Sequence, residues 1–475
     1  MPSSRFWQAF PVSYRSREVA MIAEWISAGE SGTVVGLPGT GRATLLEFLC
    51  LRPDALQTYL APYARPVVLI PVDLNNLPDS RLDTLYRVIL RSFYEIRGRF
   101  DEAVAQTVVE LFSRYESARD PVLHQGALRQ VLLLFEMQEQ RVVLVINRFD
   151  RFCRMATPQM ISTLRGMRDS FKDTLAFLMG MRHGAGYLMS RSSIGPLRGI
   201  LDTYVCRIGP LDEADALHMM ASEMRYLSPP APTSDLDRLY FLTGGYPSLI
   251  RVTCHWWMDA GERKVEDWTA ALMARPNIQH RLSELWYGLT QAEQQALSEL
   301  QMLQAHLAAA RTNSSRRQKA FAELADRHAE ALHSLESKGV CRLTEGGRQI
   351  VGSLVAAYVA LMAGRSRGQV WLNQRTREIY QGSKRVENLQ PLEYDVLRFL
   401  ISQPHTRHTH TDIIEAVWAE DILEKEGVST EALYQVIRGI RKKIEPNPAE
   451  PCYVINWRGQ REGGYQFFPE GRPRE

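Results

Sequence analysis

Four nearly continuous apolar runs are the feature of this chain that most restricts its fold. They lie within residues 32–36, 66–74, 141–152 and 174–184, and helix-like apolar patterns fill the stretches between them. Strands that are apolar on both faces belong to sheets that are covered on both faces, and helices between the strands supply that cover. The pattern therefore predicts a parallel α/β sheet, whose ligands bind at the carboxyl ends of the strands.

The first apolar run leads into a glycine-rich loop. Residues 36–45 read GLPGTGRATL, in which Gly36 and Gly41 have the spacing of the phosphate-binding P-loop, G-x-x-x-x-G-K-[ST]. The loop lies between a predicted strand and a predicted helix, which is the setting that the motif requires. In a P-loop, backbone N–H groups and the helix N-terminus surround the phosphates. The predicted phosphate-binding residues are Gly36, Pro38, Gly39, Thr40, Gly41, Arg42, Ala43 and Thr44.

The side chains of this loop depart from the P-loop pattern. Arg42 stands in the position of the lysine and keeps the charge, but its guanidinium is longer and planar. Ala43 stands where a hydroxyl normally ligates Mg²⁺, and it has no atom that could do so. Thr44 follows one position later, about 100° further round the helix. The loop therefore predicts phosphate binding with an incomplete metal site.

The segment after the third apolar run also lacks the acid that such sites place there. Its first polar residue is Asn147. Arg148 follows at the position where a catalytic acid often lies, and Asp150 is the only carboxylate nearby in the sequence. An amide is a poorer Mg²⁺ ligand than a carboxylate, and phosphoryl transfer depends on the charge of the metal. We expect ATP or ADP to be held weakly or statically, or to have been lost, with Mg²⁺ binding doubtful and hydrolysis negligible. The alternative is an active ATPase in which Asp150 and Thr44 take shifted roles.

Several motifs in residues 1–265 stand in the order of a known family. YRSREVAMIAEWI is similar to the lead-in of that family, GLPGTGRATLL to its P-loop, and VLVINRFDRF to its strand ending in D-E-x-D. Together they resemble the signal-transduction ATPases with numerous domains (STAND), relatives of the AAA+ ATPases. The resemblance implies that Arg182 is a sensor residue and that Pro247, in LTGGYPSLI, lies over the nucleotide. It implies a P-loop domain over 1–210 and a helical lid over 211–265.

Two further domains are expected after the lid. Residues 266–365 are helical with a probable hairpin at 339–347, an order that is winged-helix-like. The stretch GRSRGQ, residues 364–369, predicts a linker, so that the last domain covers residues 366–475. The expected fold is thus an α/β P-loop NTPase domain with a helical lid, followed by two winged-helix domains.

The last domain resembles, nearly end to end, the winged-helix output domain of response regulators of the OmpR/PhoB type. The stretches that carry the resemblance are TDIIEAVW, VSTEALYQVIRGIRKKI and CYVINWRGQREGGYQF. Leu433, Ile437, Ile440 and Ile444 recur at helical spacing and predict one buried stripe, and the opposite face is basic and aromatic, as a helix in the major groove needs. The predicted DNA-binding residues are Thr430, Glu431, Tyr434, Arg438, Arg441 and Lys442 on this helix, with Arg458 and Arg461 on the hairpin that would approach the minor groove.

The same domain departs from its family in ways that leave a second interpretation open. Glu431 and Ala432 stand where the family has an Arg-Thr pair that reads bases, and residues 419–427 are acidic. A carboxylate beside phosphates is unfavourable unless it accepts a hydrogen bond from cytosine. His405, His408 and His410 have no cysteine near them, and we expect no metal site there.

Composition sets the remaining limits. The formal net charge is +3 over 475 residues, so the whole chain has no strong basic field. The six cysteines form no C-x-x-C pair, the N-terminus lacks an apolar signal segment, and the apolar run at 350–364 is too short to span a membrane. We expect a cytoplasmic regulator that binds double-stranded DNA through residues 366–475, and a homo-oligomer is one arrangement that this function allows. The rival hypothesis is an adaptor or scaffold whose last domain binds a protein partner.

Overall fold

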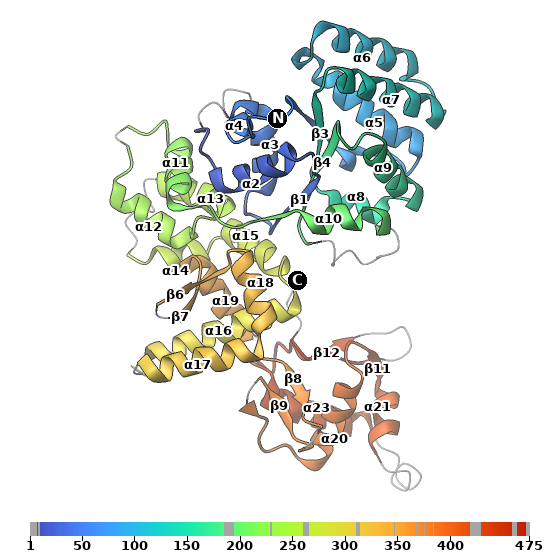
Figure 1. The fold of residues 1–475 in the computed structure, drawn as a ribbon. Coiled ribbons are helices and arrows are strands. Elements are labelled where there is room, and N and C mark those ends of the chain that lie inside the picture. Colours follow the sequence, from blue (N-terminus) through green and yellow to red (C-terminus); the bar gives the residue numbers. More distant parts are fainter. Residues whose placement is uncertain are drawn as a thin grey trace. The chain divides into compact units, whose positions relative to one another are not determined.

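The computed structural model describes residue 7 and residues 10–184, 194–228, 230–259, 266–309, 314–345, 347–365, 368–374, 376–382, 384–418, 429–457 and 463–471 (Figure 1). The chain divides into two units, residues 1–288 with 337–340 and residues 289–336 with 341–475. Within the described residues, no helix combines the length and the apolar character that crossing a bilayer requires.

A five-stranded parallel sheet forms the centre of the first unit and confirms the predicted α/β fold. Its strands are β1 (Gly32–Gly36), β2 (Val67–Val72), β3 (Arg141–Ile146), β4 (Leu175–Met181) and β5 (Val205–Ile208), in the order β2-β3-β4-β1-β5. Every residue of β1, β3 and β4 is buried, as expected for strands covered on both faces. Strand β5 was not predicted, because it has four residues and only two of them are buried.

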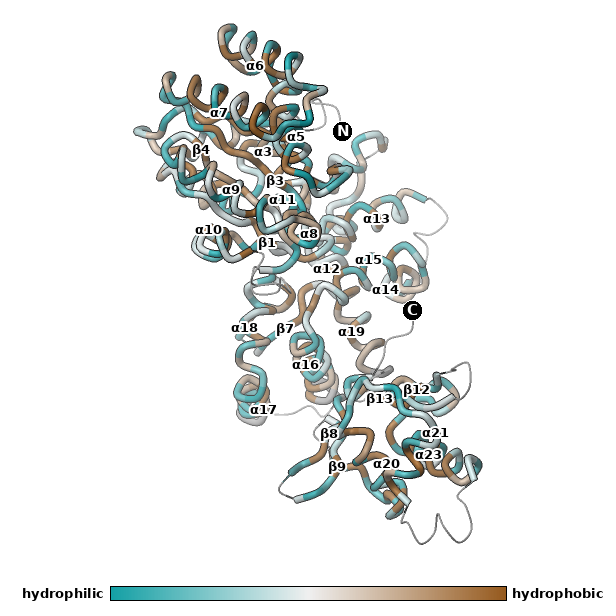
Figure 2. Tube along the Cα trace, turned by 90° about the vertical axis from the view of Figure 1, so that its right-hand side faces the viewer, coloured by the Kyte–Doolittle hydropathy of each residue, from teal (hydrophilic) through white to brown (hydrophobic). Residues whose placement is uncertain are grey.

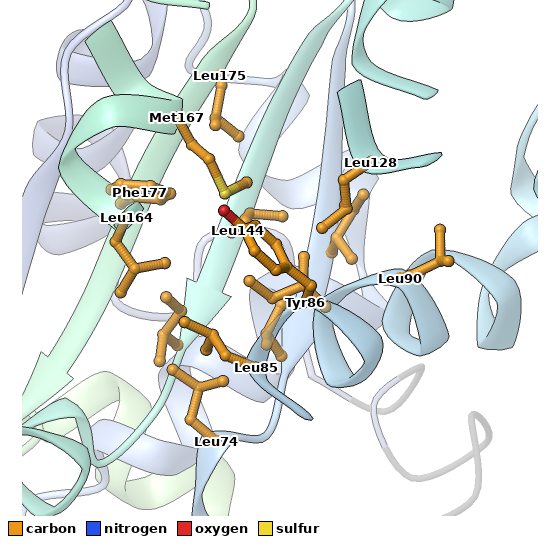
Figure 3. Close-up of a cluster of buried hydrophobic side chains, with 14 of the residues drawn as sticks. Leu74, Leu85, Tyr86, Leu90, Leu128, Leu144, Leu164, Met167, Leu175 and Phe177 are labelled. Carbon is orange, nitrogen blue, oxygen red and sulfur yellow. The ribbon is translucent and has the colours of Figure 1, made fainter. Parts of the chain in front are cut away.

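Long amphipathic helices cover the β2–β3–β4 side of the sheet. They are α5 (Leu82–Glu95), α6 (Glu102–Tyr115), α7 (Pro121–Met137) and α9 (Pro158–Ser170). Helix α5 packs on β2, α7 on β3 and α9 on β4. The starts of α6, α7 and α9 are fixed by the side chains of Asp101, Asp120 and Thr157, each of which accepts a hydrogen bond from a backbone N–H of the first turn. Figure 3 shows side chains of these helices gathered around Leu144 of β3 in one apolar cluster.

Shorter elements complete this part of the first unit. They are α2 (Ser16–Ser27), α3 (Arg42–Leu51), α4 (Pro53–Gln57), α8 (Phe149–Met155), α10 (Arg198–Thr203) and the 3₁₀ turns η1 (Leu74–Asn76), η2 (Arg97–Arg99) and η4 (Gly195–Leu197). Helix α3 packs against β1, β2 and β4.

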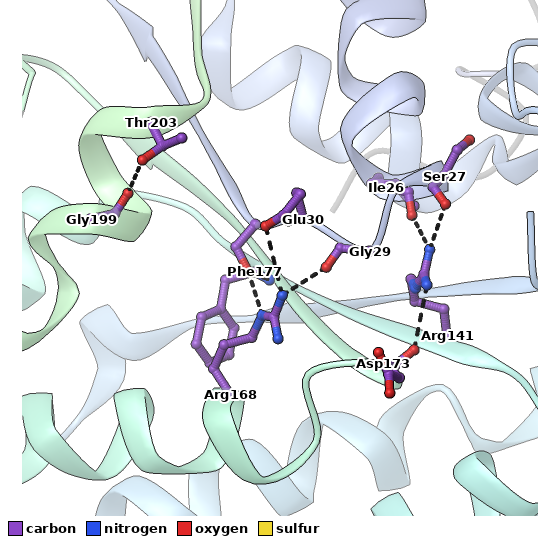
Figure 4. A network of polar contacts seen from close by, with 11 residues as sticks. Ile26, Ser27, Gly29, Glu30, Arg141, Arg168, Asp173, Phe177, Gly199 and Thr203 are labelled. Carbon is purple, nitrogen blue, oxygen red and sulfur yellow. Dashed lines mark hydrogen bonds and ion pairs between the residues drawn. The ribbon is translucent and has the colours of Figure 1, made fainter.

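The buried Arg141 and the partly buried Arg168 tie the end of α2 and the turn before β1 to their neighbours (Figure 4). Arg141, the first residue of β3, donates to the carbonyl oxygens of Ile26 and Ser27. Arg168 of α9 donates to the carbonyl oxygen of Gly29 at 2.7 Å. These bonds lie at the amino ends of the strands, so they fix the sheet at the edge opposite to the glycine-rich loop.

A helical region follows β5 within the first unit. It contains α11 (Glu213–Glu223), α12 (Thr233–Thr243), α13 (Pro247–Met258), α14 (Trp268–Met273) and α15 (Pro276–Tyr287). Gly244 and Gly245 end α12 with φ angles of 60° and 81°, a conformation that glycine adopts without strain. Pro247 then starts α13 at a position where its missing N–H costs nothing. The predicted motif LTGGYPSLI is therefore the turn between two helices.

The second unit begins with three helices and a hairpin. These elements are α16 (Gln291–Ala309), α17 (Ser314–Arg327), α18 (Ala329–Ser337), β6 (Cys341–Thr344) and β7 (Gly347–Ile350), and α19 (Ser353–Arg365) follows them. Strands β6 and β7 are antiparallel, so a hairpin lies where one was predicted. Helix α17 is strongly hydrophilic (Figure 2). The winged-helix interpretation of residues 266–365 and the four-domain division stay predictions.

The C-terminal part of the second unit has a helical core between two small antiparallel sheets, which confirms the predicted winged helix. Its elements are β8 (Val370–Leu372), β9 (Ile379–Gln381), β10 (Lys384–Arg385), α20 (Pro391–Ser402), β11 (Arg407–Thr409), α21 (His410–Val417), α23 (Thr430–Ile444), β12 (Val454–Trp457) and β13 (Gly464–Phe467). The sheets have the orders β10-β9-β8 and β11-β13-β12. Helices α20, α21 and α23 share one apolar core with both sheets.

Candidate nucleotide cleft and nucleic-acid interface

The parallel sheet brings three predicted polar segments to one edge. In the register of β1, β4 and β3, Val35 pairs with Met181 and Met179 pairs with Ile146, so these strands end side by side. The glycine-rich loop after β1, Arg148 after β3 and Arg182 after β4 consequently line one cleft of about 260 Å³. The helical region contributes Met219, Pro247, Ser248, Arg251, Arg281 and Glu284, and the N-terminal segment contributes Phe10 and Tyr14.

The glycine-rich loop has a conformation that depends on its glycines. Gly39 and Gly41 have φ angles of 88° and 86°, and a Cβ at Gly39 would collide with the hydroxyl of Ser248. Gly41 is the N-cap of α3, and the first N–H bonded within that helix is that of Leu45, at 2.9 Å from the carbonyl oxygen of Gly41. The N–H groups before Leu45 have no acceptor in the helix, so they form the positive helix end that binds anions.

Arg42 is the charged side chain at the centre of this site. It is 8% exposed, and its Nε and Nη1 donors have no hydrogen-bond partner among the described residues. Burial lowers the pKa of Arg42 to about 10, the charge of Asp150 opposes that shift, and the charges of Arg182 and Arg148 add to it. Buried donors without partners are costly, so an anionic oxygen in the cleft would satisfy a need that the protein leaves open.

The groups that would hold Mg²⁺ are poorly suited to it. Ala43 lines the cleft without a donor atom, and the side-chain oxygen of Asn147 accepts the N–H of Arg148 at 2.9 Å. Asp150 is 6% exposed and does not line the cleft. Glu284 is the one carboxylate among the described lining residues, and it pairs with Arg281 at 2.9 Å. The donor set therefore fits a phosphate group and lacks the carboxylates that Mg²⁺ prefers.

The helical region and the glycine-rich loop are in direct contact. A Cβ at Gly41 would lie 3.1 Å from Cγ of Pro247, and the N–H of Ser248 donates to the carbonyl oxygen of Gly39 at 3.2 Å. In this geometry Pro247 lies against the loop itself. Of the predicted nucleotide-binding residues, the cleft brings together Gly36, Pro38, Gly39, Gly41, Arg42, Ala43, Thr44, Arg182 and Pro247, whereas Thr40, Asn147 and Asp150 do not line it.

Sequence reasoning missed the residue that joins these parts. Arg15 donates to the carbonyl oxygens of Thr40 at 2.6 Å and of Gly209 at 3.0 Å, and it pairs with Glu18 at 3.2 Å. Its backbone N–H donates to the carboxylate of Asp215 at 2.8 Å. The lead-in motif was the only signal for this residue, because its partners are far away in the chain.

The second candidate site is one face of α23. Leu433, Ile437, Ile440 and Ile444 are buried, which confirms the predicted stripe. Tyr434 is 42% exposed, and Thr430, Glu431, Arg438 and Lys442 are exposed as well. The side chain of Ser429 caps the helix by accepting the N–H of Ala432. The helix thus offers an aromatic and basic face to solvent.

Arg441 lies at the edge of that face and is held by the protein. Its Nε and Nη2 donate to the carbonyl oxygen of Val454 at 3.1 and 2.6 Å, and Nη2 also donates to the side-chain oxygen of Asn456 at 2.6 Å. Burial lowers its pKa, and burial also raises the pKa of the neighbouring Tyr465 to about 12. Arg441 therefore joins α23 to β12.

A groove of about 540 Å³ separates α23 from the hairpin of β12 and β13. Its lining includes His410, Tyr434, Arg438 and Trp457.

The predicted wing residues Arg458 and Arg461 and the acidic stretch at 419–427 lie outside the described residues. The histidines His405 and His408 have different surroundings. His408 is buried and packs against Phe399, whereas His405 lies near Phe468.

Comparison with known proteins finds similarity to transcriptional regulatory proteins in the C-terminal part of the chain. Residues 384–467 match the family described as transcriptional regulatory protein, C terminal. A probable transcriptional regulatory protein of Picosynechococcus sp. is 35% identical over 80 residues, which are 17% of this chain and 29% of that protein. The uncharacterized transcriptional regulatory protein YkoG of Bacillus subtilis is 35% identical over 88 residues, which are 18% of this chain and 36% of that protein. The chain thus spans about a third of the length of these relatives.

Among solved structures, the Walker-type ATPase PABY2304 of Pyrococcus abyssi aligns with 73% of this chain and 95% of its own length. The identity is 13% and the TM-score is 0.38, and a similarity this low assigns no function to this chain.

Proposed function

We propose that this protein is a regulator that binds double-stranded DNA. The proposal is supported by the match of residues 384–467 to the family of transcriptional regulatory C-terminal domains. In this proposal residues 366–475 are the DNA-binding domain. Residues 1–265 form a STAND-like module that senses a signal or assembles the protein, with a P-loop domain at 1–210 and a lid at 211–265. Residues 266–365 are a second winged-helix domain.

The observation that carries this proposal is the exposed face of α23. Tyr434, Arg438 and Lys442 follow one another at intervals of four residues, so they lie on one side of the helix. The buried stripe opposite them fixes that side toward solvent. An arginine on such a helix can donate two hydrogen bonds to guanine in the major groove. Glu431, in the first turn, can accept from the amino group of cytosine.

The first unit supports a nucleotide-responsive role in the same proposal. The cleft combines a glycine-rich loop, a helix N-terminus and buried arginine donors, and its lid contacts the loop through Pro247 and Ser248. ATP or ADP would be held by the loop and by Arg42, and Arg182 would approach the phosphates from β4. Because Ala43 and Asn147 replace metal ligands, the site is proposed to hold nucleotide without hydrolysing it.

A binding titration on the full chain tests the DNA-binding role. Duplexes enriched from a random-sequence pool are titrated by fluorescence anisotropy at low salt with the wild type and with Arg438→Ala. Loss of a base contact is expected to cost about 1–3 kcal/mol and to relax the sequence preference. Arg398→Ala is the matched control, since Arg398 is an exposed arginine of α20 that pairs with Asp395 at 3.2 Å.

The outcomes separate the two classes of function. A regulator loses affinity with Arg438→Ala and keeps it with Arg398→Ala. If the full chain binds no duplex above the non-specific level at low salt, the DNA-binding role is wrong. The adaptor hypothesis then takes its place, and the same face of α23 becomes the surface on which to map a protein partner.

A further inference from the structure

We propose that the cleft of the first unit binds the phosphate chain of a nucleotide as a metal-free anion, with Arg42, Arg148 and Arg182 supplying the positive charge. This inference rests on the nucleotide-responsive role proposed above and specifies the form of the ligand. The protein would then respond to a nucleotide without requiring Mg²⁺ to bind it.

The three arginines line one cleft and have donors that the protein does not use. Arg42 is more than nine-tenths buried, lines the cleft beside the N-terminus of α3, and has two donors without partners among the described residues. Arg148 and Arg182 line the same cleft and are exposed, and neither side chain makes an ion pair or hydrogen bond within the part of the chain that the structure describes. Three guanidinium groups with free donors therefore surround one space.

The backbone conformation of Arg148 is energetically unfavourable. Its φ angle is 56°, a left-handed conformation that an L-residue with a side chain rarely adopts. The side chain of Asn147 stabilises this turn by accepting the N–H of Arg148. The turn directs Arg148 to the cleft where a catalytic acid would stand in a metal-dependent site, so the position carries a positive charge in place of a negative one.

The other two arginines that line the cleft already have acidic partners. Arg251 and Arg281 also line the cleft, but they pair with Glu223 at 3.1 Å and with Glu284 at 2.9 Å. Their charges are largely balanced. Arg148 and Arg182 have no ion-pair partner among the described residues, and the charge of Asp150 offsets only part of the positive charge around Arg42. Each phosphate oxygen can accept from a guanidinium in a charge-assisted bond, and the planar group suits this geometry.

The cleft also has side chains that suit the ring of a nucleotide. The cleft is also lined by Phe10, Tyr14 and Met219, and these side chains can pack against a flat apolar ring. Arginines for phosphates together with aromatic and apolar side chains for a ring describe a nucleotide better than they describe a bare polyphosphate.

The test is a calorimetric titration of the full chain with ADP and ATP, once with EDTA and once with excess MgCl₂. We expect affinity in EDTA to equal or exceed affinity with Mg²⁺, because the metal would neutralise the charge that the arginines recognise. Arg148→Ala and Arg182→Ala are each expected to weaken binding about tenfold or more. Arg91→Ala, at an exposed arginine of α5 that pairs with Glu95 at 2.9 Å and does not line the cleft, should leave binding unchanged. Both test residues are exposed, and thermal unfolding of each variant checks that it folds.

Each result decides a different point. Binding that requires Mg²⁺, or that is unaffected by Arg148→Ala and Arg182→Ala, overturns the metal-free inference and leaves the nucleotide-responsive role standing. No binding of either nucleotide in either buffer overturns that role as well. Pyrophosphate serves as a competitor, and if it binds as tightly as ADP, the ring-binding part of the inference is wrong.

Discussion

At the scale of single residues, Arg441 shows that a basic residue at the edge of the proposed DNA-binding face can have a structural role within its own domain. Its guanidinium joins α23 to β12 through Val454 and Asn456, and the guanidinium carbon lies 5.7 Å from the centroid of the Tyr465 ring. Arg441→Ala would leave the carbonyl oxygen of Val454 without this donor, and we expect a loss of about 1–3 kcal/mol in the free energy of unfolding. Lys442→Ala, at the next and exposed position, should change it by less than about 0.5 kcal/mol. Chemical unfolding of the full chain, followed by hydrogen exchange of α23 and β12, measures both. Equal effects of the two substitutions would contradict the joining role.

At the scale of elements, the start of α21 depends on a capping box. Thr409 accepts the N–H of Asp412 at 3.1 Å, and Asp412 accepts the N–H of Thr409 at 2.8 Å. The backbone N–H of Thr409 holds the pKa of Asp412 below its usual value. A lowered carboxyl pKa stabilises the fold above the unfolded pKa, and this contribution is lost as the pH falls through the folded pKa. Asp412→Ala should therefore destabilise α21 by about 1 kcal/mol at pH 7, with a smaller deficit near pH 3. Glu415→Ala on the same helix is the control, and a deficit independent of pH would count against the carboxylate as its source.

At the scale of the whole molecule, the two units have complementary roles in the proposed function. If the first unit assembles the protein, two DNA-binding domains act together, and the second contact forms at high effective concentration. The full chain should then bind a duplex with two copies of its site at least tenfold more tightly than the same duplex with one copy scrambled. Its affinity should also fall more steeply with salt on the paired site, because more phosphates are contacted. Titrations at about 50 and 200 mM salt measure both effects, and light scattering gives the oligomeric state. Equal affinity for the two duplexes would mean that the protein binds DNA as a single copy.

Features that depend on local pattern could be predicted from the sequence. Strands β1, β3 and β4 were predicted because an unbroken apolar run is stable only when both faces are covered, and the fold gave them that cover. The buried stripe of α23 was predicted because helical spacing places its members on one side. The parallel order also predicted that the loop after β1, Arg148 and Arg182 would meet, since the carboxyl ends of such strands share an edge.

The groups that those residues contact depend on how distant segments pack together. Arg15 and Asp215 are 200 positions apart, and no local pattern connects them. Strand β5 has too few buried residues to stand out, and it forms because β1 offers a free edge for pairing. The sequence placed Arg441 and Arg438 on neighbouring parts of one helix, but the fold turned Arg441 to β12 and left Arg438 in solvent. The sequence specifies the charge of a side chain, whereas the partner of that side chain depends on which distant segment of backbone packs beside it.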